Sequence, residues 1–296
     1  MSSNNSKNIA KNGNSKSPNS KSGNTLIYVI VALAIILIVF FIYSTIVSYR
    51  NYQKYSPYLI DGIIDTYVPY KINSNKIQPS SDNQYGTEFS YSFWIYIKDT
   101  NFTKSTETCS SNNETPLLHV FHKGSNDFIA SGSDTSKAVY YPLLQMPGVW
   151  LYPNTNKLNI RFNTYDNVVE TADVGNIPLN SWVNINIILI GSSVDVYVNG
   201  NLKKRNKLNG VPKINYGDLY VSNYGGFNGF LCKLRYYNYA IQPFQVDQIF
   251  AQGPASQFDS TYSNGLSNPP PELSYNYWMT TGYPNTVNTP QYKQAP

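Results

Sequence analysis

An uninterrupted apolar run near the amino terminus, residues 25–49, constrains this chain more than any other feature. The run reads TLIYVIVALAIILIVFFIYSTIVSY, and no charged side chain lies between Lys21 and Arg50. As a helix it would be about 37 Å long, whereas about 20 apolar residues suffice to cross the hydrocarbon core of a bilayer. A helix also satisfies its own backbone hydrogen bonds in lipid. The run therefore predicts one transmembrane helix.

A cleaved signal peptide is the alternative interpretation of this run. The apolar core of a signal peptide usually has about 7–15 residues and ends at small side chains. Here the core is longer, a polar segment precedes it, and the bulky residues Ile46, Val47 and Tyr49 close it. These features favour an uncleaved anchor, so that the protein is tethered to a lipid bilayer.

The charges are distributed unevenly along the chain. All 17 acidic residues follow Arg50, and the excess of five positive charges lies in the first 50 residues. The carboxyl part is therefore neutral, which argues against nucleic acid as a partner because phosphate binding needs a basic surface.

Four lysines precede the apolar run, and only Arg50 and Lys54 follow it closely. This bias predicts a cytoplasmic amino terminus and an exoplasmic carboxyl domain. The lysines also suit an anionic leaflet, or they only set topology and solubility.

Composition divides the rest of the chain into four segments. Residues 1–24 are Ser, Asn, Lys and Gly with few apolar side chains, which predicts a disordered basic tail. Residues 50–86 contain three prolines and are predicted to be a connector or the first strands. Residues 87–253 are the predicted β domain. Residues 254–296 are rich in Pro, Tyr and Asn, and we expect them to wrap the domain as irregular chain anchored by aromatic side chains such as Trp278.

Apolar side chains recur with a period of two from Glu88 onwards, which indicates β-strands. Asn199-Gly200 lies between two alternating segments and predicts a tight hairpin. Only Pro243–Phe250 has a helical pattern, with Pro at the first position and Gly253 after it. Many short strands separated by Gly, Asn and Pro turns are typical of a sandwich or barrel. The predicted strands are Phe89–Lys98, Leu117–Lys123, Leu143–Leu151, Leu158–Phe162, Val168–Val174, Trp182–Leu189, Val194–Val198, Leu219–Val221 and Phe230–Tyr237.

Several short motifs, in this order, resemble a known family over residues 85–253. They are Phe89–Trp94 (FSYSFW), Phe121–Gly124 (FHKG), Pro178–Val183 (PLNSWV), Val194–Gly200 (VDVYVNG), Phe227–Phe230 (FNGF) and Leu234–Ile241 (LRYYNYAI). They are similar to motifs of laminin-G-like, concanavalin A-like lectin/glucanase domains. The resemblance implies an all-β fold, a jelly-roll sandwich of two antiparallel sheets. An amino-terminal anchor joined to such a domain also resembles membrane proteins of large DNA viruses.

The resemblance bears on catalysis as well. Hydrolytic relatives carry their paired carboxylates on one strand as Glu-x-Asp-x-x-Glu, and glycoside hydrolysis needs such a pair. This sequence has no such run, so we expect no enzymatic activity. The first hypothesis is a non-enzymatic surface or virion membrane protein, whose sandwich makes structural or adhesive contacts with other membrane, capsid or surface proteins. The alternative is a carbohydrate-binding module used for glycan recognition or attachment.

Two groups of residues are candidates for ligand binding. Trp150 and Tyr152 could stack on a sugar ring, or they are core and rim aromatics of the sandwich. A basic group follows the Asn-Gly turn and could bind sulfated or sialylated glycan, or lipid headgroups. Alternatively, it is a charged edge strand that prevents sheet-to-sheet aggregation. The members of this basic group are Lys203, Lys204, Arg205 and Lys207.

The chain has only two histidines, His119 and His122. Three residues apart on a regular strand, they would point to opposite faces, so we expect one packed, one solvated, and no shared metal. A calcium site would use loop carboxylates, and Asp127 with Asp134 is the nearest such pair. These two residues are more simply solvated loop positions, and we expect no cofactor.

Two cysteines and two sequons complete the candidate positions. Cys109 and Cys232 could form one disulfide in an exoplasmic domain, or Cys232 is a buried inert thiol. Asn101 and Asn113 open N-x-Thr glycosylation sequons in the polar loop that also contains Cys109. In a chain so rich in Asn, the two sequons support exoplasmic exposure only weakly.

Overall fold

The computed structural model describes residues 20–83, 86–98, 117–126, 128–131, 139–153, 155–167 and 169–259. It divides into two compact units, the first ending at Asn51 and the second beginning at Tyr52. The second unit contains the β domain.

Helix α1 (Ser20–Tyr55) contains the apolar run. The side chains from Leu26 to Asn51 are all exposed in the protein alone, including Phe41 at 70% and Leu37 at 67%. From Leu26 to Tyr55 the helix is long and apolar enough to cross a membrane. Its composition thus fits either a membrane span or a signal anchor.

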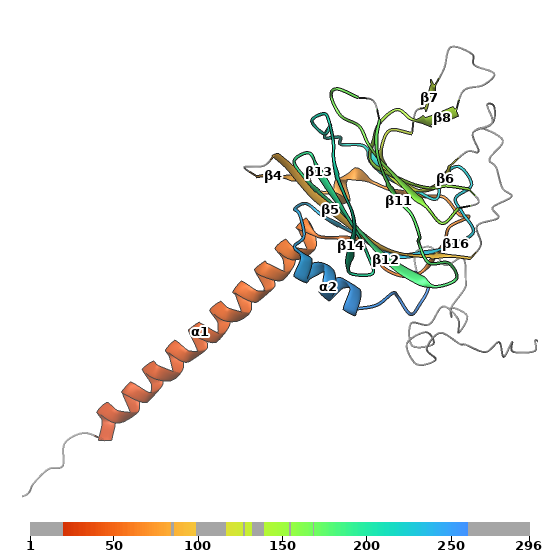
Figure 1. Cartoon of the computed structure of the whole chain (residues 1–296). Coiled ribbons are helices and arrows are strands. Elements are labelled where there is room, and N and C mark those ends of the chain that lie inside the picture. Colours follow the sequence, from red (N-terminus) through yellow and green to blue (C-terminus); the bar gives the residue numbers. More distant parts are fainter. Residues whose placement is uncertain are drawn as a thin grey trace, which may run out of the picture. The chain divides into compact units, whose positions relative to one another are not determined.

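The larger of the two main sheets contains eight strands (Figure 1). Along it the order is β1-β16-β5-β12-β13-β14, while β2 also pairs with β16 and β4 with β5. Every pairing is antiparallel. Its strands are β1 (Tyr58–Ile60), β2 (Ile64–Asp65), β4 (Ser81–Asn83), β5 (Gly86–Ile97), β12 (Trp182–Ile190), β13 (Ser193–Val198), β14 (Asn201–Lys207) and β16 (Gly229–Tyr237).

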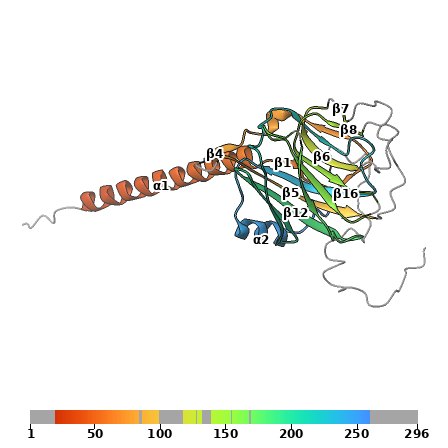
Figure 2. The same cartoon turned by 45° about the horizontal axis from the view of Figure 1, so that its top comes forward.

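The second main sheet has six strands in the order β11-β10-β9-β6-β15-β3, again all antiparallel. Figure 2 shows the two sheets as separate layers of one sandwich. Strands β7 (Phe128–Ser131) and β8 (Val139–Pro142) form a separate pair. The six strands are β3 (Tyr70–Ile72), β6 (Leu118–Gly124), β9 (Gln145–Leu151), β10 (Leu158–Phe162), β11 (Glu170–Val174) and β15 (Asp218–Val221).

The main core lies between the two sheets and follows from the period of two. On β12, Val183, Ile185 and Leu189 belong to this core, whereas Ile188 belongs to a cluster on the opposite face. Burying a large aliphatic or aromatic side chain contributes about 1.5–3 kcal/mol, so the alternating pattern strongly favours this arrangement. The predicted all-β, two-sheet sandwich with one amino-terminal helix is thereby confirmed.

The outer face of the eight-stranded sheet is covered by α2 (Pro243–Ala251) and the chain after it. Val246 of α2 is fully buried, and the Phe250 ring stacks on Trp94 with centroids 5.8 Å apart. The helix begins at the proline, as predicted. Both residues of the predicted hairpin turn have positive φ, 49° at Asn199 and 79° at Gly200, as the two-residue turn requires.

The segment before β5 contributes strands to both sheets. From the sequence, residues 50–86 were predicted to be either a connector or the first strands. Strands β1 and β2 pair with β16, and β3 pairs with β15. Between β3 and β4 lies the short 3-10 helix η1 (Ser74–Lys76). Much of this segment is therefore part of the sandwich.

Candidate functional site

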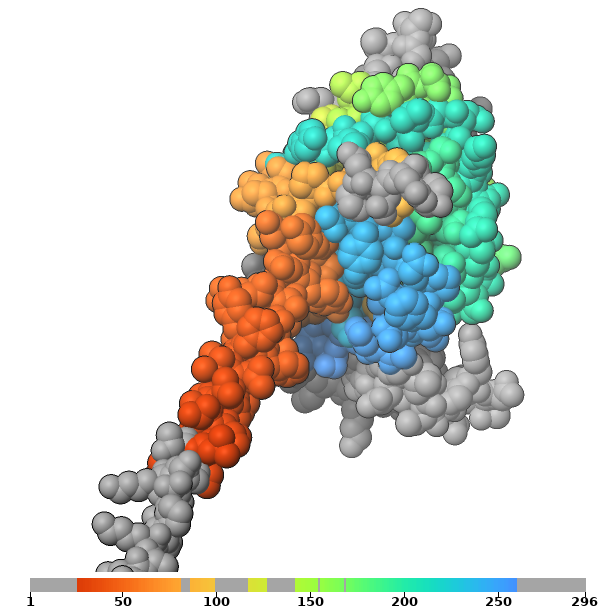
Figure 3. All heavy atoms as spheres, turned by 90° about the vertical axis from the view of Figure 1, so that its left-hand side faces the viewer, coloured from red at the N-terminus to blue at the C-terminus, as the bar shows by residue number. Residues whose placement is uncertain are grey.

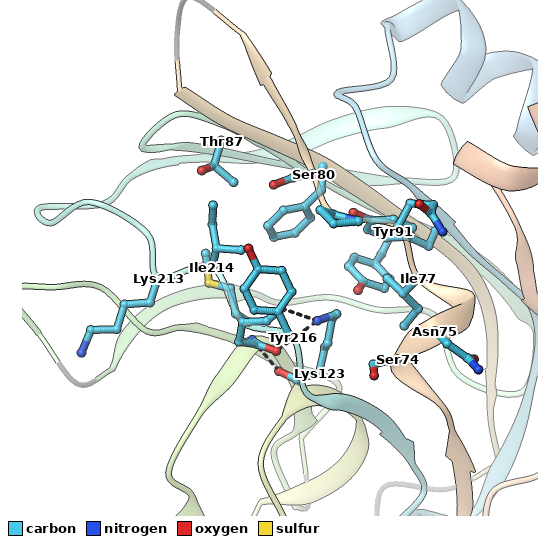
Figure 4. A pocket seen from close by; sticks show the side chains of 16 residues that line it. Ser74, Asn75, Ile77, Ser80, Thr87, Tyr91, Lys123, Lys213, Ile214 and Tyr216 are labelled. Carbon is cyan, nitrogen blue, oxygen red and sulfur yellow. Dashed lines mark hydrogen bonds between the residues drawn. The ribbon is translucent and has the colours of Figure 1, made fainter. Parts of the chain in front are cut away.

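A cavity of about 280 Å³ lies between the two sheets at one end of the sandwich (Figure 4). Its size is close to the lower limit of small-molecule pockets. The walls combine aromatic side chains from both β5 and β16 with loop residues that follow β3 and precede β15. Its lining residues include Phe89, Tyr91, Lys123, Met146, Asn215 and Tyr236.

Lys123 supplies the one ammonium group buried in this cavity, among the residues that the structure describes. Its Nζ donates to the Asn215 carbonyl oxygen at 2.6 Å and to Asn215 Oδ1 at 3.0 Å, as the dashed lines in Figure 4 mark. Asn215 Nδ2 donates in return to the Lys123 carbonyl. Burial lowers the pKa of Lys123 to about 8, although Asp218 opposes the change. The amine therefore titrates near physiological pH.

Tyr91 brings a second polar group into the cavity. Its hydroxyl is buried, and no described group forms a hydrogen bond with it. Burial raises the pKa of this phenol well above its ordinary value, so the hydroxyl stays protonated. With Lys123, Tyr91 could bind a small molecule that presents hydrogen-bond acceptors between apolar faces.

The structure places Trp150 on the outer face of the six-stranded sheet. Its side chain is only 3% exposed. The ring stacks on Tyr224 with an interplanar angle of 8°, meets His119 edge-on, and its Nε1 donates to Gln145 Oε1 at 2.9 Å. The ring and the N–H donor of Trp150 thus both have partners within the protein.

Tyr152 directly follows β9, the strand that carries Trp150. The side chain is half-buried, and its hydroxyl donates to the Asp173 carboxylate at 3.1 Å. Asn159 Nδ2 donates to the same carboxylate, and Lys157 Nζ lies 2.7 Å from it. Arg161 connects this cluster to Trp150, because its Nε donates to Asn159 Oδ1 at 2.6 Å and its guanidinium carbon lies 5.8 Å from the centroid of the Trp150 ring.

The expectation that His119 and His122 point to opposite faces, one packed and one solvated, was wrong. Both side chains are fully buried, and His119 Nε2 lies 2.8 Å from His122 Nδ1. The register of β6 against β9 shifts between His119 and Phe121, so the regular alternation is broken there. A β-bulge of this kind brings both imidazoles to the same face.

The hydrogen bonds fix the tautomers of this pair. The Ser125 carbonyl can only accept, so His122 carries its proton on Nε2, which lies 3.0 Å from that oxygen. His122 Nδ1 then accepts a hydrogen bond from His119 Nε2. The remaining nitrogen, His119 Nδ1, is buried and has no hydrogen-bond partner among the described residues. Both rings are neutral, since burial lowers the pKa of His122 to about 4 and that of His119 well below its ordinary value.

The predicted basic group lies on β14, at the edge of the eight-stranded sheet. Arg205 forms a two-point contact with Asp195 of the neighbouring strand, at 2.7 Å and 2.6 Å. The others in this group, Lys203, Lys204 and Lys207, are exposed. The group is thus available to solvent, and none of its members lines the cavity at Tyr91.

The remaining candidates are only partly described. Cys232 is buried and forms no disulfide within the described part of the chain, and its sulfur accepts a hydrogen bond from the Ala255 amide. Burial raises its pKa to about 12. The other predicted positions, Cys109, Asn101, Asn113, Asp127 and Asp134, lie outside the described residues. Among the residues that are described, no three His, Cys, Asp or Glu side chains cluster as a metal site would require.

Sequence reasoning missed Tyr91 and Lys123 as site residues. Both occur within predicted strands, and Lys123 even belongs to the FHKG motif. A lysine at the end of an apolar strand was the available signal, but the cavity also needs the loop that brings in Asn215 from 92 residues away.

The sequence matches the model of one protein family over residues 72–247, described as the concanavalin A-like lectin/glucanases superfamily. The match covers more than half of the chain and includes most strands of both main sheets. The chain therefore belongs to this superfamily. No curated protein matches it.

Solved structures similar to this chain include receptor-binding domains of botulinum neurotoxins. The type G domain is 15% identical, with a TM-score of 0.39 over 65% of this chain and 45% of that one. The binding domain of neurotoxin DC, in complex with SialylT, is 14% identical with a TM-score of 0.39, covering 67% and 46%. A mosaic serotype C/D domain is 9% identical with a TM-score of 0.42, covering 67% and 46%. This chain spans under half of the length of each.

Proposed function

We propose that the protein is a membrane-tethered, non-catalytic binding module, whose sandwich makes structural or adhesive contacts with other proteins at the surface of a cell or virion. The observation that carries the proposal is the short path from membrane helix to sandwich. Helix α1 ends at Tyr55, and β1 begins at Tyr58. Because extended chain spans at most about 3.5 Å per residue, the sandwich is held next to the bilayer. In this proposal the amino terminus is cytoplasmic and the sandwich exoplasmic.

The roles of three described carboxylates support a non-catalytic module. Glu170 accepts hydrogen bonds from the backbone amides of Asn209 and Gly210, at 2.6 Å and 2.9 Å. Asp218 pairs with Lys71 at 2.9 Å, and Asp195 pairs with Arg205. These partners lower the pKa of Glu170 and Asp218, whereas a general acid needs a raised pKa. Each of these carboxylates stabilises the fold.

The test is crosslinking of the full-length protein in its native membrane. A photo-crosslinking residue would replace Leu202 on β14 or Tyr67 in the loop after β2, both of which are exposed. A matched variant would carry it at the fully buried Val196. The proposal predicts that the exposed positions capture a defined set of membrane, capsid or surface proteins and that position 196 does not. Capture of no protein at any exposed position, or hydrolysis of a polysaccharide by the purified chain, would contradict the proposal.

Glycan recognition is the second candidate function, and the exposed cations of β14 favour it. Lys203, Lys204 and Lys207 lie on one short edge strand, where they could contact sulfate or carboxylate groups of a glycan. A glycan array probed with the full-length protein in nanodiscs tests this function. Binding that disappears when the three lysines become glutamine would support it. Absence of binding by the unmodified protein would leave protein contacts as the function.

A further inference from the structure

Exposed apolar side chains of the sandwich unit gather at one of its ends. Among the described residues from Tyr52 onwards, eleven large apolar side chains are exposed. Tyr216 is the most exposed at 74%, and Tyr165 follows at 71%. Tyr67 and Leu202 lie at the opposite end, beside the start of β16 and the β13–β14 turn. The other nine are Tyr52, Tyr55, Leu143, Tyr165, Val169, Val211, Ile214, Tyr216 and Phe244.

Strand register shows that the loops of the six-stranded sheet share this end. The start of β15 pairs with the end of β6, since Asp218 lies opposite Gly124. Gly124 in turn lies opposite Gln145, at the start of β9. The loops before β15, before β9 and between β10 and β11 therefore meet at one edge. Two of them are joined directly, because the Tyr165 amide donates to the Val211 carbonyl at 2.9 Å.

The chain enters the sandwich at the same end. The Asn238 amide, just after β16, donates to the Tyr55 carbonyl, and the Tyr236 amide donates to the Pro57 carbonyl. Tyr236 lines the cavity together with Tyr216. The carboxyl end of β16, the end of α1 and the exposed loops are thus grouped around one cavity. Figure 3 shows the segment after α1 (orange) and α2 (blue) side by side on the surface.

The chemistry of this end fits a membrane interface. Tyrosine rings prefer the headgroup level of a bilayer, and lysines there extend their ammonium groups towards water and anionic phosphates. Lys213 Nζ lies 5.6 Å from the centroid of the exposed Tyr165 ring, and Ile214 follows it with 43% of its surface exposed. Exposed aromatic and aliphatic side chains beside a lysine would be costly to leave in water.

We propose that this end of the sandwich rests on the bilayer surface, with Tyr165, Ile214 and Tyr216 inserted at the headgroup level and Lys213 contacting lipid phosphate. The proposal depends on α1 spanning that bilayer. Tyr58 lies seven positions after Asn51, which allows at most about 25 Å between their Cα atoms. The bilayer that holds α1 is therefore within reach of the exposed end. An interfacial contact of this kind adds to the anchor and orients the sandwich.

Site-directed spin labelling of the full-length protein tests the contact. In a Cys109→Ser background, single cysteines would replace Tyr165 or Tyr216, and the protein would be reconstituted in phosphatidylcholine vesicles containing phosphatidylserine. The measurement compares collisions of the nitroxide with oxygen, which dissolves in lipid, and with a water-soluble nickel complex. The matched control is Tyr67→Cys, at the opposite end, and Ile36→Cys reports whether α1 is in the bilayer.

We expect the ratio of oxygen to nickel collisions to be several-fold higher at positions 165 and 216 than at position 67. Ratios at 165 and 216 equal to that at 67, with the label at 36 in lipid, would overturn the surface contact and leave the tether intact. A label at 36 exposed to water would overturn both. Because Tyr165 and Tyr216 are more than two-thirds exposed, these replacements should leave the fold unchanged.

Discussion

The guanidinium carbon of Arg235 lies 4.4 Å from the centroid of the Tyr58 ring. The rings of Tyr237 and Tyr52 approach the same carbon to 5.0 Å and 4.7 Å. Arg235 Nε also donates to the Ser56 carbonyl at 2.9 Å. One buried arginine thus fixes the short path by which the chain passes from the last turn of α1 into the first strand of the sandwich.

Replacing this arginine should destabilise the sandwich. Arg235→Met keeps much of the side-chain volume but removes the cation–π contacts and leaves the buried Ser56 carbonyl without its donor. We expect a loss of about 3 kcal/mol in the free energy of unfolding. Arg235→Lys, which keeps the charge, should lose less. Chemical unfolding of the full-length protein in detergent measures both. Equal stability of Arg235→Met and the unmodified protein would show that the cluster contributes nothing.

The buried histidine pair predicts that stability falls in weakly acidic solution. Both residues have a lower pKa in the folded than in the unfolded chain, so the unfolded chain binds more protons. Below the ordinary value of 6.5, stability should therefore decrease as pH falls towards about 4, the pKa of folded His122. Each histidine contributes a slope of about 1.4 kcal/mol per pH unit within that range.

The slope is measured by unfolding the protein at a series of pH values between 4 and 7. Carboxylates also contribute near the acidic limit, so the informative quantity is the difference from a His122→Gln variant. His122→Gln removes one titrating group and keeps a side chain that can accept from His119. Its pH dependence should be clearly flatter. An unchanged slope would mean that His122 does not titrate as its burial requires.

The histidine pair also shows where sequence reasoning reached its limit. The alternation of apolar residues predicted β12 and β10 well, because burial on one face fixes the period over each whole strand. The bulge in β6 depends on pairing with β9, and no local pattern encodes it. The cavity depends on tertiary contacts in the same way, since Lys123 and Asn215 are far apart in the chain. The grouping of Tyr216 with other exposed apolar side chains at one end of the sandwich depends on strand directions, which the sequence alone does not give.

Tyr91→Phe should stabilise the protein slightly. The hydroxyl of Tyr91 is buried without a hydrogen-bond partner among the described residues, and a buried unsatisfied hydroxyl costs free energy. We expect the free energy of unfolding to rise by about 1 kcal/mol when the oxygen is removed. Thermal and chemical unfolding check this. A decrease in stability would instead indicate that a bound water or ligand uses the hydroxyl.

Cys232 should be unreactive in the folded protein. Its thiol is fully buried and its pKa is raised to about 12, whereas alkylation requires an accessible thiolate. Without reductant, maleimide should modify Cys232 only after unfolding, and Cys109→Ser should not change this. If the two cysteines form a disulfide, unfolding alone would expose no reactive thiol until a reductant is added. Mass spectrometry of the labelled protein distinguishes the two outcomes.

Removing the charges of β14 should promote association without unfolding. The strand is the last of the eight-stranded sheet among the described residues, and lysines on such an edge oppose pairing with another chain. We expect a triple variant, Lys203→Thr, Lys204→Thr and Lys207→Thr, to keep its free energy of unfolding within about 1 kcal/mol of that of the unmodified protein. Light scattering of the detergent-solubilised protein should nevertheless show larger particles. Arg205 is kept because its contact with Asp195 belongs to the fold. If the triple variant stays as small as the unmodified protein, the lysines are not needed to protect the edge, and a role in binding becomes the better explanation for them.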